Sequence, residues 1–145
     1  MLIIIFGESC TGKSTLADAL KARTGAQVWS GKDYLRLAKS EGEARALFQK
    51  QLKGAAEGDG DLIYVIAEPE LLALVPEGGV RVLVTAELPE IKARFAARMG
   101  GALPPPVAAM LERKHGCFDQ EPHDVHMASG VDGVETVCER ILALI

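Results

Sequence analysis

Residues 7–14, with the sequence Gly-Glu-Ser-Cys-Thr-Gly-Lys-Ser, constrain the fold of this chain more than any other feature. They satisfy the pattern G-x-x-x-x-G-K-[ST], in which glycines let the backbone wrap tightly and turn its N–H groups toward an anion. The apolar run 2–6 before the motif predicts a buried strand, and residues 14–23 after it carry apolar side chains at helical spacing. We therefore expect a phosphate-binding loop between a central strand and a helix, whose positive N-terminal end faces the same anion.

This loop, called the P-loop below, predicts a bound nucleoside triphosphate. Lys13 is expected to reach the β- and γ-phosphates, and the hydroxyl of Ser14 to bind Mg²⁺. The predicted nucleotide contacts are Gly7, Glu8, Ser9, Cys10, Thr11, Gly12, Lys13, Ser14 and Thr15. For Cys10 two interpretations stay open, a redox-sensitive thiol at a helix N-terminus or a small side chain that the loop tolerates.

The rest of the chain alternates between strand-like and helix-like segments. We expect strands at 2–6, 26–30, 62–67, 80–85 and 125–128. Helices are expected at 14–23, 33–39, 41–56, 70–75, 87–99, 107–114 and 134–145. This alternation predicts an α/β fold, a three-layer α/β/α arrangement of the P-loop NTPase type with a mostly parallel sheet of about five strands.

Composition limits the setting in which such a protein works. A length of 145 residues predicts one domain over 1–145. A net charge of −4 with 5% aromatic residues argues against a general nucleic-acid binder. No apolar run approaches the ~18 residues of a membrane span, and the first residues resemble no secretory signal. Three cysteines, an odd number, suggest reduced thiols in the cytoplasm.

The chain contains no asparagine, so the Asn-Lys-x-Asp signature of guanine recognition is absent, and its length is short for a motor domain. Residues 29–36, Trp-Ser-Gly-Lys-Asp-Tyr-Leu-Arg, resemble the Ser/Thr-Gly-Asp-x-Leu-Arg region of adenylate kinases with Lys32 inserted. The resemblance, to P-loop nucleotide and small-metabolite kinases, implies that Arg36 holds an acceptor phosphate. In the shikimate-kinase-like branch it implies that Asp33 contacts an acceptor hydroxyl as base or orienting group. The alternative is an Asp at a helix start beside a solvated Arg.

Glu68 directly follows the strand predicted at 62–67. Because parallel strands deliver functional residues from their C-terminal ends, this carboxylate is expected to meet Mg²⁺ or a water bound to it. The alternative is an exposed Glu before Pro69. The Asp-Gly-Phe-Pro-Arg segment of adenylate kinases is absent, so its acceptor contacts are not transferred to this chain.

Residues 92–115 form a basic segment, with five Lys and Arg against one Glu, in an otherwise acidic chain. The segment resembles the helix that leads into the lid of nucleotide and shikimate-type kinases. The resemblance implies that Arg94 or Arg98 lies near adenine or a phosphate, and that Arg113 acts from a lid at about 100–122. A solvated basic face would give the same pattern. Gly100 and Gly101 predict a hinge, and the three prolines at 104–106 a stiff stop.

All three histidines lie near the C-terminus, at 115, 123 and 126. If 123–126 is extended, His123 and His126 face opposite sides, so we do not expect these histidines to share a metal ion.

Together these features predict an ATP- and Mg²⁺-dependent phosphotransferase. Its small acceptor would be a nucleoside monophosphate or a hydroxylated metabolite. The residues expected to act in transfer are Lys13, Asp33, Arg98 and Arg113. The alternative is an ATP-binding regulatory switch without a small acceptor, and a polynucleotide 5′-end kinase is disfavoured by charge and aromatic content.

Overall fold

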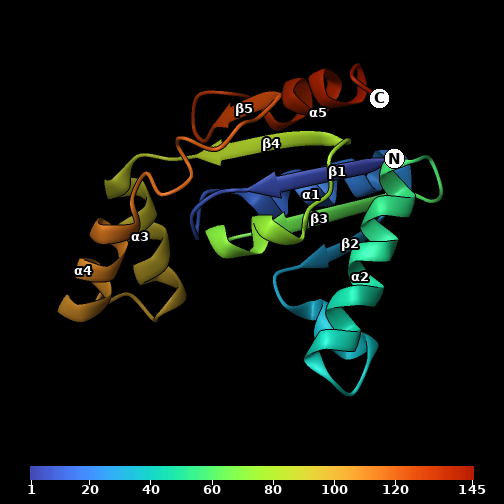
Figure 1. Ribbon diagram of the computed structural model, residues 1–145. Helices are drawn as coiled ribbons and strands as arrows, with labels where there is room; N and C mark the ends of the chain where they lie inside the picture. Colours follow the sequence, from blue (N-terminus) through green and yellow to red (C-terminus); the bar gives the residue numbers. More distant parts are fainter.

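Five parallel strands organise the chain in the computed structural model, which describes residues 1–145 (Figure 1). The strands are β1 (Leu2–Phe6), β2 (Gln27–Ser30), β3 (Leu62–Ile66), β4 (Val80–Thr85) and β5 (Val125–Ala128). Their order across the sheet is β2-β3-β1-β4-β5, and every neighbouring pair is parallel. The predicted three-layer α/β/α fold is confirmed.

Five α-helices and two 3-10 helices accompany the strands, and the last helix follows the last strand. They are α1 (Lys13–Thr24), η1 (Asp33–Leu37), α2 (Glu41–Ala56), η2 (Pro69–Leu74), α3 (Leu88–Arg98), α4 (Pro105–Lys114) and α5 (Val134–Leu142). The helices predicted at 33–39 and 70–75 are therefore short 3-10 turns. The prolines at 104–106 do not act as the predicted stiff stop, because Pro105 and Pro106 begin α4. In the first turn of a helix the backbone N–H has no intrahelical partner, so proline, which lacks this N–H, is tolerated there.

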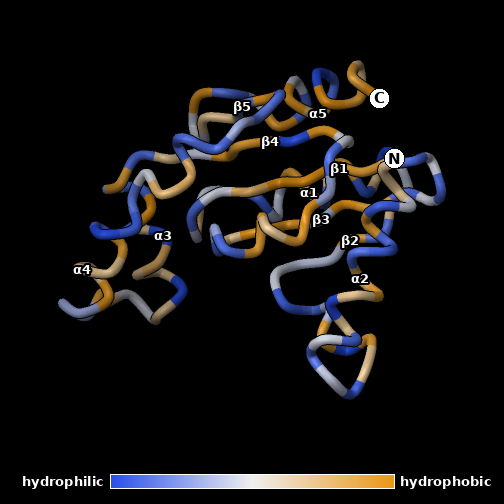
Figure 2. The backbone as a smooth tube through the Cα atoms, in the orientation of Figure 1, coloured by the Kyte–Doolittle hydropathy of each residue, from blue (hydrophilic) through white to orange (hydrophobic).

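The core divides into two layers, one on each face of the sheet. Alternate residues of β1 point to opposite faces, so Leu2, Ile4 and Phe6 pack toward α2 while Ile3 and Ile5 pack toward α1 and α5. Figure 2 shows the apolar character that runs along β1 and β3, the strands at the centre. All ten residues of these two strands are buried, which fixes the end of β1 from which the P-loop emerges.

Helices α3 and α4 lie beyond the C-terminal ends of the strands, apart from the two main layers (Figure 1). They have a small core of their own, in which Ile91 of α3, Leu111 of α4 and Cys10 of the P-loop are buried together. Gly100 and Gly101, both with positive φ, make the turn between the helices. None of the helices combines the length and apolar character that a membrane-spanning segment requires.

Candidate active site

The P-loop connects β1 to α1, and two glycines make its path sterically feasible. Gly7 approaches β4 so closely that a Cβ would lie 2.1 Å from the carbonyl oxygen of Val84. Gly12, at the start of α1, has φ +102. Cys10 is the one residue other than glycine with positive φ (+63), and its side chain packs in the α3–α4 core. The path of the P-loop is thus fixed by its backbone conformation and by its close approach to β4.

Lys13 is buried within this loop, with 7% of its surface exposed. Its Nζ donates to the carbonyl oxygen of Glu8 at 2.5 Å, an oxygen that also accepts from Thr11 Oγ1 at 2.8 Å. The pKa of Lys13 is lowered to about 8, chiefly by burial and also by the nearby guanidinium of Arg98, while Cys10 and Glu8 act in the opposite direction. A buried ammonium with one carbonyl partner is a cation that an anionic group at the loop would stabilise.

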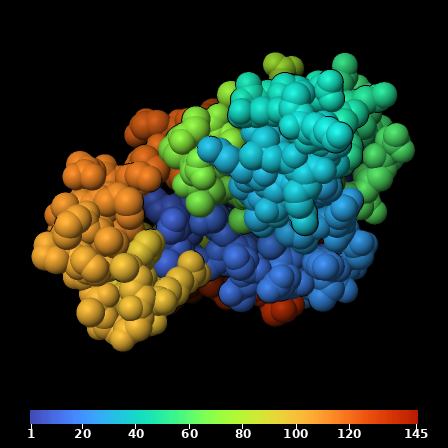
Figure 3. Space-filling view, turned by 90° about the horizontal axis from the view of Figure 1, so that it is seen from below, coloured from blue at the N-terminus to red at the C-terminus, as the bar shows by residue number.

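A cavity of about 350 Å³ opens in front of the loop. We call it the phosphate cavity; residues 9–15 line it together with Ser30, Gly31, Val65, Ala67, Glu68 and Arg98. Figure 3 shows the corresponding hollow. The P-loop (dark blue) lies there between α3–α4 (yellow and orange) on one side and η1, α2 and η2 (cyan to green) on the other. Of the residues predicted from the sequence, the structure brings together Lys13, Ser14, Thr15, Glu68 and Arg98 around this space.

Two oxygen donors of the kind that Mg²⁺ prefers face the phosphate cavity. The hydroxyl of Ser14 is exposed at the start of α1, and the carboxylate of Glu68 follows β3, 4.0 Å from the ammonium of Lys32. No group of three or more His, Cys, Asp or Glu side chains is placed to hold a metal ion. The donors present therefore fit a Mg²⁺ ion that takes its other ligands from phosphate and water.

Arg94 and Arg98 line a second cavity of about 400 Å³, which Gly12, Met127, Ser129 and Asp132 also border. Arg94 is held by several groups at once. Its guanidinium donates to the carbonyl oxygen of Cys10 at 3.0 Å and to Ser129 Oγ at 2.9 Å, and it pairs with Glu90. These bonds tie α3 to the P-loop and to the segment after β5, while Arg98 is left facing Lys13.

Asp33 and Arg36 lie outside both cavities. A carboxylate oxygen of Asp33 accepts from the backbone N–H of Ser30 at 3.2 Å. The guanidinium of Arg36 donates to the carbonyl oxygen of Asp33 and lies 5.6 Å from the ring centroid of Trp29. Both side chains are exposed, and their acceptor roles stay predictions.

A third cavity, of about 270 Å³, lies between the P-loop, the end of β3 and α4. We call it the α4 cavity. Its walls are Glu8, Ser9, Ala67, Glu68, Pro69, Glu70, Met110, Leu111, Lys114 and Cys117. Lys114 from α4 faces it, whereas Arg113 is exposed and borders none of the cavities described. Helical spacing could have indicated that Lys114, rather than Arg113, faces this cavity, because Lys114 shares a helix face with Met110 and Leu111.

The side chain of Glu8 was not predicted to have a structural role, but it fastens α4 to the P-loop. One carboxylate oxygen lies 3.1 Å from His115 Nδ1, and the other accepts from the N–H of Gly116 at 3.1 Å. Only 11% of this side chain is exposed. No sequence pattern signals this contact, since Glu8 and His115 are more than 100 positions apart in the sequence.

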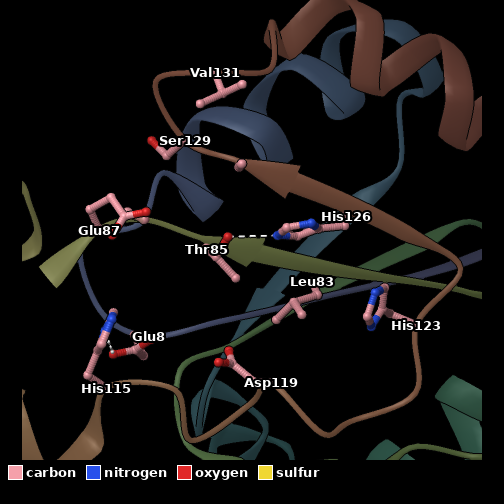
Figure 4. A pocket seen from close by; sticks show the side chains of 12 residues that line it. Glu8, Leu83, Thr85, Glu87, His115, Asp119, His123, His126, Ser129 and Val131 are labelled. Atoms are coloured by element: carbon pink, nitrogen blue, oxygen red, sulfur yellow. Dashed lines mark hydrogen bonds and ion pairs between the residues drawn. The ribbon is translucent and has the colours of Figure 1, made fainter.

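All three histidines border one further cavity of about 410 Å³, over β4 and β5 (Figure 4). The rings of His123 and His126 lie 6.0 Å apart. The expectation that they face opposite sides applies only if 123–126 is extended, and this condition is not met, because β5 begins at Val125. His123 precedes β5, and strand alternation does not govern its direction. His126 Nε2 is bonded to Thr85 Oγ1 at 2.7 Å.

No protein-family model matches this chain, and no curated protein matches it by sequence. Solved structures do share its fold. A sugar kinase from Janibacter sp. is 17% identical with a TM-score of 0.61, over 98% of this chain and 92% of that one. A shikimate kinase from Aquifex aeolicus is 19% identical with a TM-score of 0.55, over 99% and 95%. A gluconokinase from Sinorhizobium meliloti is 16% identical with a TM-score of 0.57, over 97% and 89%.

This chain therefore has the fold of the P-loop small-metabolite kinases. The resemblance inferred from the sequence is confirmed at that level.

Proposed function

We propose that this protein is an ATP- and Mg²⁺-dependent phosphotransferase that acts on a small acceptor. The observation that carries the proposal is the phosphate cavity, where the buried ammonium of Lys13, the guanidinium of Arg98 and the P-loop backbone meet the carboxylate of Glu68. Structural similarity to a sugar kinase, a shikimate kinase and a gluconokinase supports this class of reaction.

The P-loop amides and Lys13 would bind the β- and γ-phosphates, and Arg94 and Arg98 would hold the nucleoside side and the transferring phosphate. Ser14 and Glu68 would hold Mg²⁺, which neutralises phosphate charge when bound. Arg113 would act from the segment 100–122 as a lid. The whole chain 1–145 would form one kinase domain, working in the cytoplasm with its three thiols free.

In the transfer, an acceptor oxygen forms a bond to the γ-phosphorus, and the bond from that phosphorus to the β–γ bridging oxygen breaks. The bridging oxygen leaves with the electron pair as part of ADP, and Lys13 and Arg98 stabilise the charge that moves. A phosphate acceptor needs no base, and Arg36 would bind it. A hydroxyl acceptor releases a proton, for which Asp33 is the proposed base.

The test is the variant Lys13→Ala, with Lys21→Ala on the exposed face of α1 as the matched control. Removing one preorganised cation is expected to lower ATP turnover by about 10²–10³-fold, while the control keeps wild-type turnover. Binding of ATP-Mg²⁺ is measured by calorimetry beside the turnover assay. Undiminished ATP affinity in Lys13→Ala would contradict the assignment of the site.

A regulatory ATP-binding switch is the second candidate. It is favoured by the position of Asp33 and Arg36, which border neither the phosphate cavity nor the α4 cavity. A panel of nucleoside monophosphates and hydroxylated metabolites separates the two candidates through acceptor-dependent release of ADP. Stimulation by an acceptor supports the kinase, and intact ATP binding without any stimulation supports the switch.

A further inference from the structure

We propose that the α4 cavity holds the phosphoryl acceptor, and that this acceptor is an uncharged or cationic hydroxyl compound rather than an anionic one. The inference rests on the proposed function and deepens it by naming the acceptor's chemistry. Three properties of the cavity support it: its position, its charge and its apolar wall.

Its position comes from the walls that it shares with the phosphate cavity. Ser9, Ala67 and Glu68 border both spaces, so the two cavities adjoin at the end of β3. A molecule in the α4 cavity would have its hydroxyl beside the group that Lys13 and Arg98 hold. In-line displacement at phosphorus requires such an approach from the side away from the leaving group.

The charge of the α4 cavity is opposite to that of a site for an anion. Three glutamates line it, Glu8, Glu68 and Glu70, against the single lysine, Lys114. Glu8 is bonded to His115 and Glu68 lies 4.0 Å from Lys32, so Glu70 is the one of the three without an ion-pair partner. No arginine borders it, although phosphates and carboxylates in proteins are typically bound by the two-pronged guanidinium. Arg36, the residue predicted to bind an acceptor phosphate, lies over the ring of Trp29 instead.

The thiol of Cys117 reports the same environment. Partial burial of the thiol first, and then the negative charge of Glu8, raise the pKa of Cys117, which means that a second anion is disfavoured there. The positive charge of Lys114 acts in the other direction but ranks below that of Glu8.

The apolar wall and the size of the cavity narrow the acceptor further. Pro69 after β3, and Met110 and Leu111 of α4, add apolar surface to its walls. A volume of about 270 Å³ falls below the ~300–1,000 Å³ of pockets for drug-sized ligands. The acceptor is therefore a compact alcohol with an apolar face, such as a nucleoside or polyol if uncharged, or an amino alcohol if cationic.

Charged thiol reagents measure the charge of this cavity without knowledge of the acceptor. Cys117 is exposed, whereas Cys10 and Cys138 are buried. We would compare the labelling rates of Cys117 with a positively and a negatively charged methanethiosulfonate, each normalised to the unfolded protein. Cys117→Ser identifies the labelled residue.

The cationic reagent is expected to react several-fold faster after normalisation, as a cleft potential of a few kT implies. Glu70→Gln should lower this ratio, and Glu57→Gln, the same change at an exposed site on the far end of α2, should leave it unchanged. Equal rates, or a faster anionic reagent, would overturn the proposal while leaving the phosphotransferase assignment intact.

A second measurement uses acceptors directly, with three arms in the ADP-release assay: uncharged alcohols, amino alcohols, and anionic acceptors such as nucleoside monophosphates and sugar acids. Turnover stimulated by the first or the second arm, together with protection of Cys117 from labelling, supports the inference. The arm that stimulates shows whether the acceptor is an uncharged alcohol or an amino alcohol. Stimulation by the anionic arm alone overturns the inference but not the kinase. No stimulation by any arm, with ATP bound, overturns both.

Discussion

The P-loop and the α3–α4 segment border the same cavities but are stabilised in different ways. The P-loop lies between β1, all of whose residues are buried, and α1, whose apolar face belongs to a cluster of 16 buried residues. The α3–α4 core contains three buried residues, and one of them, Cys10, belongs to the P-loop. The P-loop is thus held by the best-packed part of the fold, while the α3–α4 wall of the α4 cavity has little packing of its own.

Three contacts compensate for this small core. The Cys10 side chain packs against α3 and α4, Arg94 donates to the Cys10 carbonyl, and Glu8 binds His115 and the N–H of Gly116. Every one of them ends on the P-loop. We infer that α3 and α4 can shift or loosen without unfolding the sheet, as the proposed lid would require.

The largest expected effect tests the rigid side of this comparison. In Gly7→Ala the new Cβ would lie 2.1 Å from the backbone oxygen of Val84, an atom that cannot move without disturbing β4. We expect a loss of about 3 kcal/mol or more in the free energy of unfolding, measured by urea denaturation. Gly42→Ala in α2, with nothing within 4 Å of the new Cβ, is the control and should be neutral or stabilising by up to about 1 kcal/mol. Similar stabilities for the two variants would contradict a rigid P-loop.

A smaller effect should come from Lys13→Met, and its sign depends on pH. Because the folded pKa of about 8 lies below the ordinary 10.5, folding disfavours the charged form of Lys13. That penalty is fully present below pH 8 and disappears as the pH rises toward 10.5. The variant should therefore be more stable than wild type at pH 7, by up to about 3 kcal/mol, and the difference should shrink above pH 8 toward zero beyond pH 10.5.

Thermal unfolding from pH 6 to pH 10.5 measures this difference, and ATP-Mg²⁺ supplies the control. Bound phosphate should stabilise the wild type strongly and the variant little, since ligand binding adds to stability only through the folded state. A variant less stable than wild type at pH 7 would mean that the bond from Lys13 Nζ to the Glu8 carbonyl outweighs the burial of its charge.

The same contrast explains what could be predicted from the sequence. The P-loop, the strands at 2–6, 80–85 and 125–128 and the helix at 41–56 were predicted correctly, because local pattern and burial agree there. Glu68 was expected from the rule that parallel strands end at one edge, and Arg98 was implied by the resemblance to the helix that leads into a kinase lid; both line the phosphate cavity. The Glu8–His115 contact depends on how α4 packs, which no local pattern encodes.

The smallest expected effect tests the weakly attached side. Glu8→Ala removes the acceptor of the Gly116 N–H and the partner of His115, and a lost hydrogen bond of this kind is worth about 1 kcal/mol. Because α4 has few other anchors, we expect faster hydrogen exchange at Gly116 and through α4, with the amides of β1 and β3 unchanged. Glu8→Gln keeps an oxygen that can accept from Gly116 but loses the charge beside His115, so its exchange should be intermediate. If β1 and β3 also exchanged faster in Glu8→Ala, Glu8 would stabilise the whole fold, and the separation between a rigid P-loop and a loosely held α4 would be wrong.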